Sequence, residues 1–147
     1  MDRAFTLDAP VDVVWPWFVQ LGKQRSGWYL PRKLERLIPS RRHALRSIEP
    51  NLQQLKVGDV IPDWGGRDAT FEVAQLQAPT TLVLCSRRGN TNLSWAINLR
   101  AVNASSTRVH LRLRMSPVKW RRLAGTAGGL VDLLTIAGLA AGLDERV

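Results

Sequence analysis

The sequence predicts an α+β domain in which a curved antiparallel sheet wraps around a long C-terminal helix, with two short helices near the N-terminus. Three observations predict this class. Apolar residues recur at helical spacing near the N-terminus, apolar and polar residues alternate from position 60 onward, and a glycine-rich apolar segment closes the chain. A chain of 147 residues suits one domain, residues 1–147, with a core that is stable without disulfides or metals.

The first strand and the first helix are predicted in the opening 22 residues. Residues 3–7 alternate as a strand does, and Pro10 suits the first turn of a helix that follows. Pro16 removes a backbone donor, so we expect the helix to be kinked there or to begin after Pro10. Its buried face carries apolar side chains at the i, i+3, i+4 and i+7 positions Val14, Trp17, Phe18 and Leu21.

The chain then changes from helical to strand periodicity. A second short helix is predicted to bury Leu34, Leu37 and Ile38 on one side and to end at Pro39. Period-two alternation begins beyond Val60 and continues to position 116. One predicted strand places Leu93, Trp95, Ile97 and Leu99 on a single face, and the next places Val109, Leu111, Leu113 and Met115 opposite Arg108, His110, Arg112 and Arg114. These faces differ sharply in polarity, as in an antiparallel sheet with one side buried and the other in water.

The final segment, residues 119–146, is predicted to form a long helix. A stripe of larger apolar residues comprises Leu123, Ala127, Leu130, Leu134, Ala137 and Ala141, and a second side gathers Gly125, Gly128, Gly129, Asp132 and Thr135. Small inward-facing residues let a helix approach the sheet or leave room for a ligand. Because each interior glycine lowers helix stability by about 1 kcal/mol relative to alanine, we expect this helix to be mobile, as a lid over a pocket would be.

The same segment permits a membrane interpretation, since residues 123–143 are apolar, follow a basic cluster and contain two GxxxG spacings. Asp132 argues against insertion, because a central aspartate is unfavourable by about 2.5–3.5 kcal/mol on insertion scales. We therefore expect no integral membrane insertion.

Several motifs resemble those of a known superfamily. They are Trp15-Pro16-Trp17, Gln20-Leu21-Gly22, Gly27-Trp28-Tyr29, Pro50-Asn51-Leu52-Gln53 and Val57-Gly58-Asp59. In order and spacing they resemble the START-like (SRPBCC, Bet v 1-like) superfamily, and specifically its bacterial polyketide cyclase/dehydrase-like branch. The resemblance covers nearly the whole chain and implies a helix-grip fold with an internal apolar cavity. Asn51 departs from the pattern, which has glutamate there, so any role of that charge is lost.

Composition excludes several function classes. The net charge of +9 invites a nucleic-acid interpretation, but the arginines are spread along the chain and no recognition motif accompanies them, so nucleic-acid binding is not expected. Two histidines and one cysteine lie far apart, which predicts no metal site, and no cofactor is expected. The single cysteine and the absence of an apolar run of signal-peptide length favour the cytoplasm.

Candidate ligand-binding residues are five aromatic residues outside the first helix, three aliphatic residues of the long strands and one carboxylate of the terminal helix. They are Trp28, Tyr29, Trp64, Phe71, Trp95, Ile97, Leu111, Leu113 and Asp132. Trp28 and Tyr29 follow a glycine turn, where a polar ring atom can reach a partner at a cavity mouth. For Trp95, cavity lining and plain core packing are both open. His110 shares the polar face of its strand, so a solvated side chain is favoured over a general base, and no catalytic residue is assigned.

The predicted function is the binding of a small hydrophobic molecule, lipid-like or polyketide-like, in a cavity between the sheet and the terminal helix. A cyclase or dehydratase using the same cavity is one alternative, with Asp132 or Tyr29 moving a proton. An interaction module with a basic sheet face is another. The sequence offers no convincing acid–base pair, so binding is favoured over catalysis.

Overall fold

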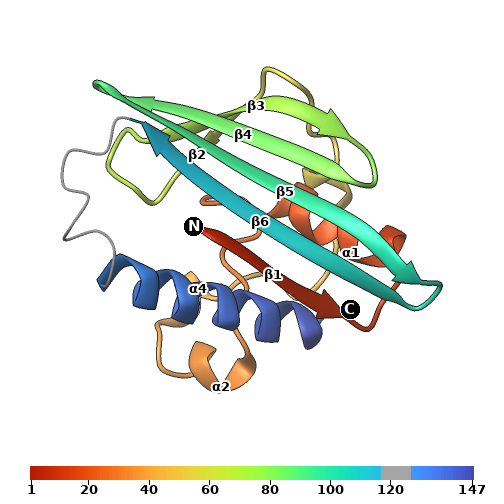
Figure 1. The fold of residues 1–147 in the computed structure, drawn as a ribbon. Helices are drawn as coiled ribbons and strands as arrows, with labels where there is room; N and C mark the ends of the chain where they lie inside the picture. Colours follow the sequence, from red (N-terminus) through yellow and green to blue (C-terminus); the bar gives the residue numbers. More distant parts are fainter. Residues whose placement is uncertain (117–126) are drawn as a thin grey trace.

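A six-stranded antiparallel sheet forms one layer of the molecule, and helices lie along it (Figure 1). The computed structural model describes residues 1–116 and 127–147. The strand order is β1-β6-β5-β4-β3-β2. The strands are β1 Asp2–Leu7, β2 Val60–Pro62, β3 Thr70–Gln77, β4 Thr81–Arg88, β5 Thr91–Asn103 and β6 Ser106–Ser116. The helices are α1 Val11–Gln20, α2 Arg32–Glu35 and α4 Ala127–Asp144, with the 3-10 turns η1 Ser40–Arg42 and η2 Pro50–Leu52. The predicted α+β helix-grip class is confirmed.

The core lies on the inward face of the sheet, which receives every second residue of the alternating strands. Register places Ile97 of β5 opposite Leu111 of β6 and Leu99 opposite Val109. Of these, Ile97, Val109 and Leu111 have no exposed surface. Arg112 lies on the other face, opposite Asp2 of β1. The predicted polarity of β6 is therefore correct for Val109 and Leu111, whereas Met115, predicted on the same face, is exposed.

Helix α1 begins at Val11, after Pro10, and includes Pro16. It buries its predicted apolar face against the sheet, and its last residue, Gln20, is fully buried as well. The Gln20 side chain donates to the Ser47 carbonyl at 3.1 Å and accepts from the Glu49 N–H at 3.0 Å and the Gln53 amide at 3.3 Å. Gln20 and Gln53, one from each of two motifs noted in the sequence, thus hold the loop after α2 against α1.

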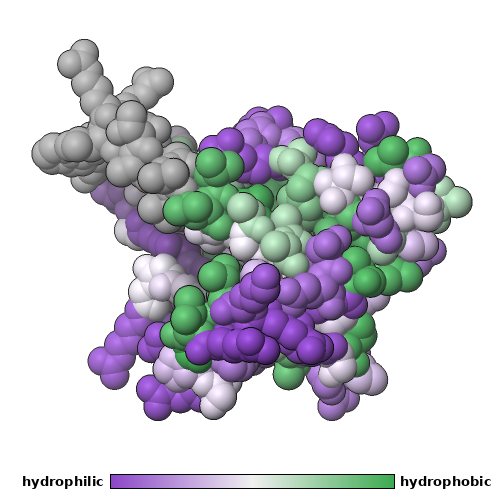
Figure 2. Space-filling view, turned by 90° about the horizontal axis from the view of Figure 1, so that it is seen from below, coloured by the Kyte–Doolittle hydropathy of each residue, from purple (hydrophilic) through white to green (hydrophobic). Residues whose placement is uncertain are grey.

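Helix α2 is shorter than predicted and faces the other way. Leu34 and Leu37 are exposed, while Glu35 is buried. The reason is electrostatic: the Glu35 carboxylate accepts hydrogen bonds from Arg46 at 2.5 Å and Arg146 at 2.8 Å. A buried carboxylate needs cations beside it, and Arg46 and Arg146 supply them only when Glu35 points inward. Figure 2 shows the face that carries α2 and α4, where hydrophobic side chains lie among hydrophilic ones.

Helix α4 runs along the β1 side of the sheet, and the packed face of its described part includes glycines, as expected, and not the stripe of larger apolar residues (Figure 1). Leu134, Ala137 and Ala141 are exposed, whereas the buried face is formed by Ile136, Gly138, Leu139, Gly142 and Leu143. Gly142 decides this orientation. A methyl group there would lie 2.6–2.7 Å from backbone atoms of Tyr29 and Leu30, so only glycine allows this approach. The predicted helical residues 119–126 lie outside the described residues. Among the described helices, none has the length and apolar character needed to cross a membrane.

The C-terminal end of α4 is fixed by Arg146, whose side chain is fully buried. We call Arg146, its partners Glu35 and Tyr29, and Arg46, the second cation bound to Glu35, the Arg146 clamp. The guanidinium donates to the carbonyls of Leu45, Leu30 and Gly142 at 2.9, 3.0 and 2.6 Å and lies 5.0 Å from the centre of the Tyr29 ring. Burial alone would raise the pKa of Glu35, but the hydrogen bonds from Arg46 and Arg146 hold it below its ordinary value.

Candidate ligand pocket

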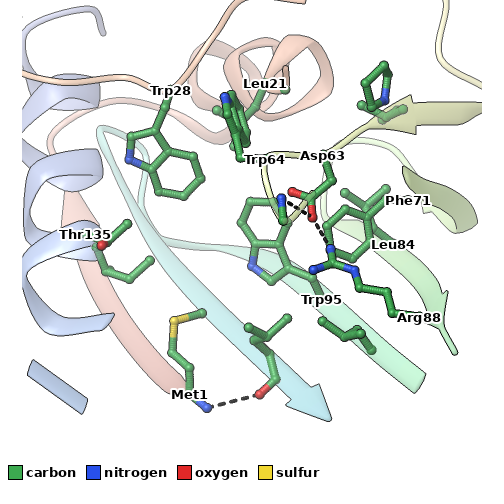
Figure 3. A pocket seen from close by; sticks show the side chains of 17 residues that line it. Met1, Leu21, Trp28, Asp63, Trp64, Phe71, Leu84, Arg88, Trp95 and Thr135 are labelled. Atoms are coloured by element: carbon green, nitrogen blue, oxygen red, sulfur yellow. Dashed lines mark hydrogen bonds and ion pairs between the residues drawn. The ribbon is translucent and has the colours of Figure 1, made fainter. Parts of the chain in front are cut away.

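A pocket of about 400 Å³ lies between the inward face of the sheet, the described part of α4 and two loops (Figure 3). The sheet contributes Ile61, Pro62, Phe71, Leu84, Arg88, Leu93, Trp95 and Leu113, and Met1 precedes its first strand. Helix α4 contributes Thr135 and Ile136, and the loops contribute Leu21, Gly22, Trp28, Asp63, Trp64 and Gly65. Aliphatic and aromatic side chains dominate this lining. Such a wall favours the burial of apolar ligand surface.

Four rings form what we call the aromatic wall: Trp28, Trp64, Phe71 and Trp95. Trp28 and Trp95 are stacked, with ring centroids 6.1 Å apart and an interplanar angle of 26°. Trp64 meets Trp28 edge to face at 5.9 Å and 88°. Phe71 lies 6.3 Å from Trp95 at 49°. These separations are typical of interacting aromatic pairs, so the rings fix one another around the pocket.

Each ring of the wall comes from a different element. A bridge between Gly22 and Gly27, with Gly27 at φ +86°, turns the chain so that Trp28 projects over the sheet. Alternation along β3 and β5 turns Phe71 and Trp95 inward. Trp64 lies in the loop after β2 and is half-exposed, which places it at the mouth of the pocket.

An ion pair fixes that loop. Asp63 pairs with Arg88 of β4 and also accepts a hydrogen bond from the Gly65 N–H at 3.2 Å. The Asp63 carbonyl accepts from the Lys23 ammonium group at 3.0 Å. The Arg88 guanidinium in turn lies 5.5 Å from the centre of the Phe71 ring. The Asp63–Arg88 pair thus connects the loop bearing Trp64 to the sheet beside the aromatic wall.

Two polar atoms of the wall are buried without a partner. The indole N–H groups of Trp28 and Trp95 have no hydrogen-bond acceptor within the described structure. Buried donors are normally paired, and leaving one unpaired is unfavourable by about 1–3 kcal/mol. Both belong to the stacked pair, and in Figure 3 both nitrogens lie on the side of the ring turned toward Thr135 of α4.

The structure gathers five of the nine predicted ligand-binding residues around this pocket: Trp28, Trp64, Phe71, Trp95 and Leu113. Ile97 and Leu111 lie elsewhere, as a fully buried cross-strand pair beneath the sheet. Asp132 belongs to α4, but its side chain is not among those described.

Tyr29 is turned away from the pocket, although Trp28 lines it. Its hydroxyl donates to the Trp17 carbonyl at 2.8 Å and lies 2.6 Å from the Ser26 hydroxyl. Burial raises the pKa of Tyr29 to about 12. The Tyr29 phenol is neutral, fully buried and hydrogen-bonded to Trp17 and Ser26, so its role is structural. The structure gives no support to proton transfer by Tyr29 in the pocket.

Other residues of the lining were not singled out from the sequence. Leu93 was predicted on the same strand face as Trp95 but not selected as a ligand contact, and Leu84 lies in a continuous apolar run that does not alternate. Met1 has no sequence signal: its ammonium group donates to the Leu113 carbonyl at 3.1 Å, which brings the N-terminus to the pocket. The Asp63–Arg88 pair joins positions far apart in sequence and depends on the fold.

The remaining polar candidates lie away from the pocket. His110 is on the outer face of β6, where it contacts Asp2, and Asp2 also pairs with Arg112 at 2.7 Å. Hydrogen bonds from His110 and Arg112 hold the pKa of Asp2 below its ordinary value. Asn51 is exposed in η2, and neither it nor His110 lines the pocket. Within residues 1–116 and 127–147, no group of three His, Cys, Asp or Glu side chains is placed to hold a metal ion.

Comparison with solved structures identifies proteins of the same fold. A crystal structure of CalU16 from Micromonospora echinospora superposes with a TM-score of 0.59 at 14% identity, over 99% of this chain and 74% of that one. An HSP90 activator from Plasmodium falciparum gives 0.57 at 15% identity, over 95% and 89%. DynU16, a protein in the dynemicin biosynthetic locus, gives 0.56 at 17% identity, over 100% of this chain and 49% of that one.

At these identities the likeness establishes the fold and not the activity. No protein-family model matches the sequence, and no curated protein matches it either.

Proposed function

We propose that this domain binds a small apolar molecule in the pocket between the sheet and α4. The observation that carries the proposal is the pocket itself, about 400 Å³ with a lining of mostly aromatic and aliphatic side chains. Removing apolar ligand surface from water at about 25 cal/mol per Å² would drive binding. The sequence motifs and the fold shared with DynU16 support placing the chain in the polyketide cyclase/dehydrase-like branch, with a lipid-like or polyketide-like ligand.

Binding is favoured over catalysis by the chemistry of the lining. An acid–base enzyme needs a titratable group that is free to exchange a proton with the substrate. The described carboxylate of the pocket, Asp63, is engaged by Arg88 and Gly65. The described contacts therefore suit holding a ligand, and a cyclase or dehydratase would need a proton-moving group other than Asp63 and Tyr29.

The second candidate function is an interaction module, and one observation favours it. On the outer face of the sheet, register places Arg100 directly opposite Arg108, and Arg112 and Arg114 follow on the same strand. Like charges directly opposite each other destabilise a sheet, so an acidic partner docking there would relieve their repulsion.

Native mass spectrometry on gently purified protein, followed by solvent extraction, tests the proposal. A stoichiometric apolar adduct is expected. A bare protein that also binds no added apolar probe would overturn the proposal and favour the interaction module.

Two variants on the same strand sharpen the test. Trp95→Ala removes part of the aromatic wall and is expected to abolish the adduct. Ile97→Ala, two residues along β5 and outside the pocket, should lower the free energy of unfolding by about 2–5 kcal/mol and keep the adduct on the folded protein. Equal loss of the adduct in both variants would mean that Trp95 acts only through the core.

A further inference from the structure

We propose that residues 32–43, which we call the α2 surface, dock on membranes that contain anionic lipids. The cations of this surface contact lipid phosphate groups, and Leu34 and Leu37 enter the outer part of the acyl layer. The inference is independent of the proposed function, because it concerns a different part of the molecule from the pocket.

The first step concerns the charge of the α2 surface. Five of its twelve residues are Lys or Arg, and its one carboxylate is the buried Glu35. All five cations are exposed, namely Arg32, Lys33, Arg36, Arg41 and Arg42. Among the described residues, none of the five has a carboxylate partner. A cluster of cations of this size attracts an anionic lipid surface.

The second step concerns two leucines within the same surface. Leu34 is 44% exposed and Leu37 is 80% exposed. The fold fixes this orientation, because the Glu35 carboxylate points inward to Arg46 at 2.5 Å and Arg146 at 2.8 Å. Turning α2 to bury the leucines would take Glu35 away from both arginines. The structure thus holds apolar side chains outward among cations, a combination typical of segments that lie in a membrane interface.

The third step concerns a recess in the α2 surface. It has a volume of about 210 Å³ and is lined by Arg32, Glu35, Arg36, His43 and Arg46. The Glu35 oxygens already accept hydrogen bonds from Arg46 and Arg146, and Arg46 also lies 3.3 Å from Glu145. These four arginines and two glutamates leave a net charge of +2. The recess therefore suits an anionic group, and arginine binds phosphate oxygens particularly well.

The fourth step decides between possible partners. A nucleic acid or an acidic peptide would neutralise the cations but would leave an exposed leucine with little to contact. A bilayer offers phosphate groups and acyl chains at successive depths, and long Lys and Arg side chains keep their charges at the level of the phosphates. Figure 2 shows the face that carries α2, on which hydrophobic side chains lie among hydrophilic ones. A lipid surface is the partner that uses both kinds of side chain.

Flotation of the intact protein with lipid vesicles tests the proposal. Vesicles of phosphatidylcholine alone are compared with vesicles in which about one third of the lipid is the anionic phosphatidylglycerol. The protein is expected to float with the anionic vesicles and not with the neutral ones, and its binding should weaken as salt is raised, because salt screens exposed charges. Equal flotation with both kinds of vesicle, or with neither, would overturn the proposal.

A charge variant and its control locate the contact. Arg41→Gln/Arg42→Gln removes two exposed cations of the α2 surface. Since each cation near a lipid surface contributes about fivefold in affinity, this variant should bind anionic vesicles about 25-fold more weakly. Arg100→Gln/Arg108→Gln makes the same change in net charge on the outer face of the sheet and should lose much less. Equal losses in the two variants would mean that net charge alone drives binding, and the α2 surface would be ruled out as the docking site.

A leucine variant separates a bilayer from a soluble anion. Leu37→Ser should weaken binding to anionic vesicles by about threefold to tenfold, because less apolar surface leaves water. Val102→Ser, at an apolar residue that is 53% exposed near the end of β5, is the control and should bind as the wild type does. Soluble glycerol phosphate, added at constant ionic strength, should displace the protein poorly. Full displacement by it, together with unchanged binding of Leu37→Ser, would assign the recess to a soluble phosphate compound and overturn membrane docking.

Discussion

The pocket and the Arg146 clamp both bury polar side chains beside α4, but they treat them differently. At the clamp, Arg146 uses its guanidinium nitrogens on Leu45, Leu30, Gly142 and Glu35. In the pocket, two buried indole N–H groups have no partner within the described structure. The saturated hydrogen bonds of the clamp fix α4 in place, whereas the pocket is lined by aromatic and aliphatic side chains that leave space for a ligand.

Helix α4 contributes to both the pocket and the clamp. Thr135 and Ile136 line the pocket, while Gly142 and Arg146 fasten the end of the same helix to the segment that carries Tyr29. Trp28 immediately precedes that fastened segment. The clamp therefore sets the distance between Trp28 and α4, two sides of the pocket.

The largest expected effect comes from breaking the clamp. Arg146→Met keeps the length and apolar contacts of the side chain but leaves the buried Glu35 carboxylate with Arg46 alone. Removing one partner of a buried ion pair destabilises by about 3–5 kcal/mol, and we expect a loss of that size in urea unfolding.

Arg112→Met is the matched control, because it breaks an ion pair with Asp2 on the exposed face of the sheet. It should leave the free energy of unfolding nearly unchanged. Similar losses in the two variants would show that burial does not distinguish the two ion pairs, and the assignment of the clamp would fail.

The fold class could be predicted from the sequence because alternate residues of a strand point to opposite faces of the sheet. Ile97, Leu99, Val109 and Leu111 are buried as predicted. The helices were harder to predict, for two physical reasons. A helical wheel ranks residues by hydrophobicity, but α2 is oriented by the charge of Glu35 and α4 by the missing side chain of Gly142. Both effects depend on partners more than 100 residues away in the chain, Arg146 for Glu35 and Tyr29 for Gly142.

The candidate site, too, could be predicted only in part from the sequence. Trp28, Trp64, Phe71, Trp95 and Leu113 were selected from the sequence and surround the pocket. Composition and alternation could not separate pocket from core on one strand face, so Ile97 was selected with Trp95 although only Trp95 lines the pocket. That difference is set by how α4 and the loops cover the sheet, which no local pattern encodes.

A smaller effect is expected from adding one methyl group at the contact between α4 and Tyr29. Gly142→Ala would place the methyl 2.6–2.7 Å from backbone atoms of Tyr29 and Leu30, which cannot move aside as a side chain can. Overpacking of this kind is unfavourable by about 1–3 kcal/mol, partly offset by about 1 kcal/mol of helix propensity. We expect net destabilisation of up to about 2 kcal/mol in urea unfolding.

Gly138→Ala, one turn earlier on the same face, is the control for helix propensity. There the methyl would lie 3.1 Å from the end of the Leu30 side chain, which can rotate away. This variant should be neutral or stabilising by up to about 1 kcal/mol. If both variants were stabilising, the close approach at Gly142 would be disproved.

At neutral pH no effect on stability is expected from the last group considered, the phenol of the clamp, because it titrates only at high pH. Tyr29 is the single tyrosine of the chain, so its ionisation can be followed directly by phenolate absorbance. Burial raises the pKa of Tyr29 from 10.0 to about 12. A raised pKa in the folded state means that the contribution of this group to stability is complete below pH 10 and is lost as the pH rises toward 12. The folded protein should therefore form phenolate only near pH 12 or at its alkaline unfolding, and the urea-unfolded protein near pH 10. Phenolate formation near pH 10 in a chain that is still folded would place Tyr29 in water and remove the contrast between the clamp and the pocket.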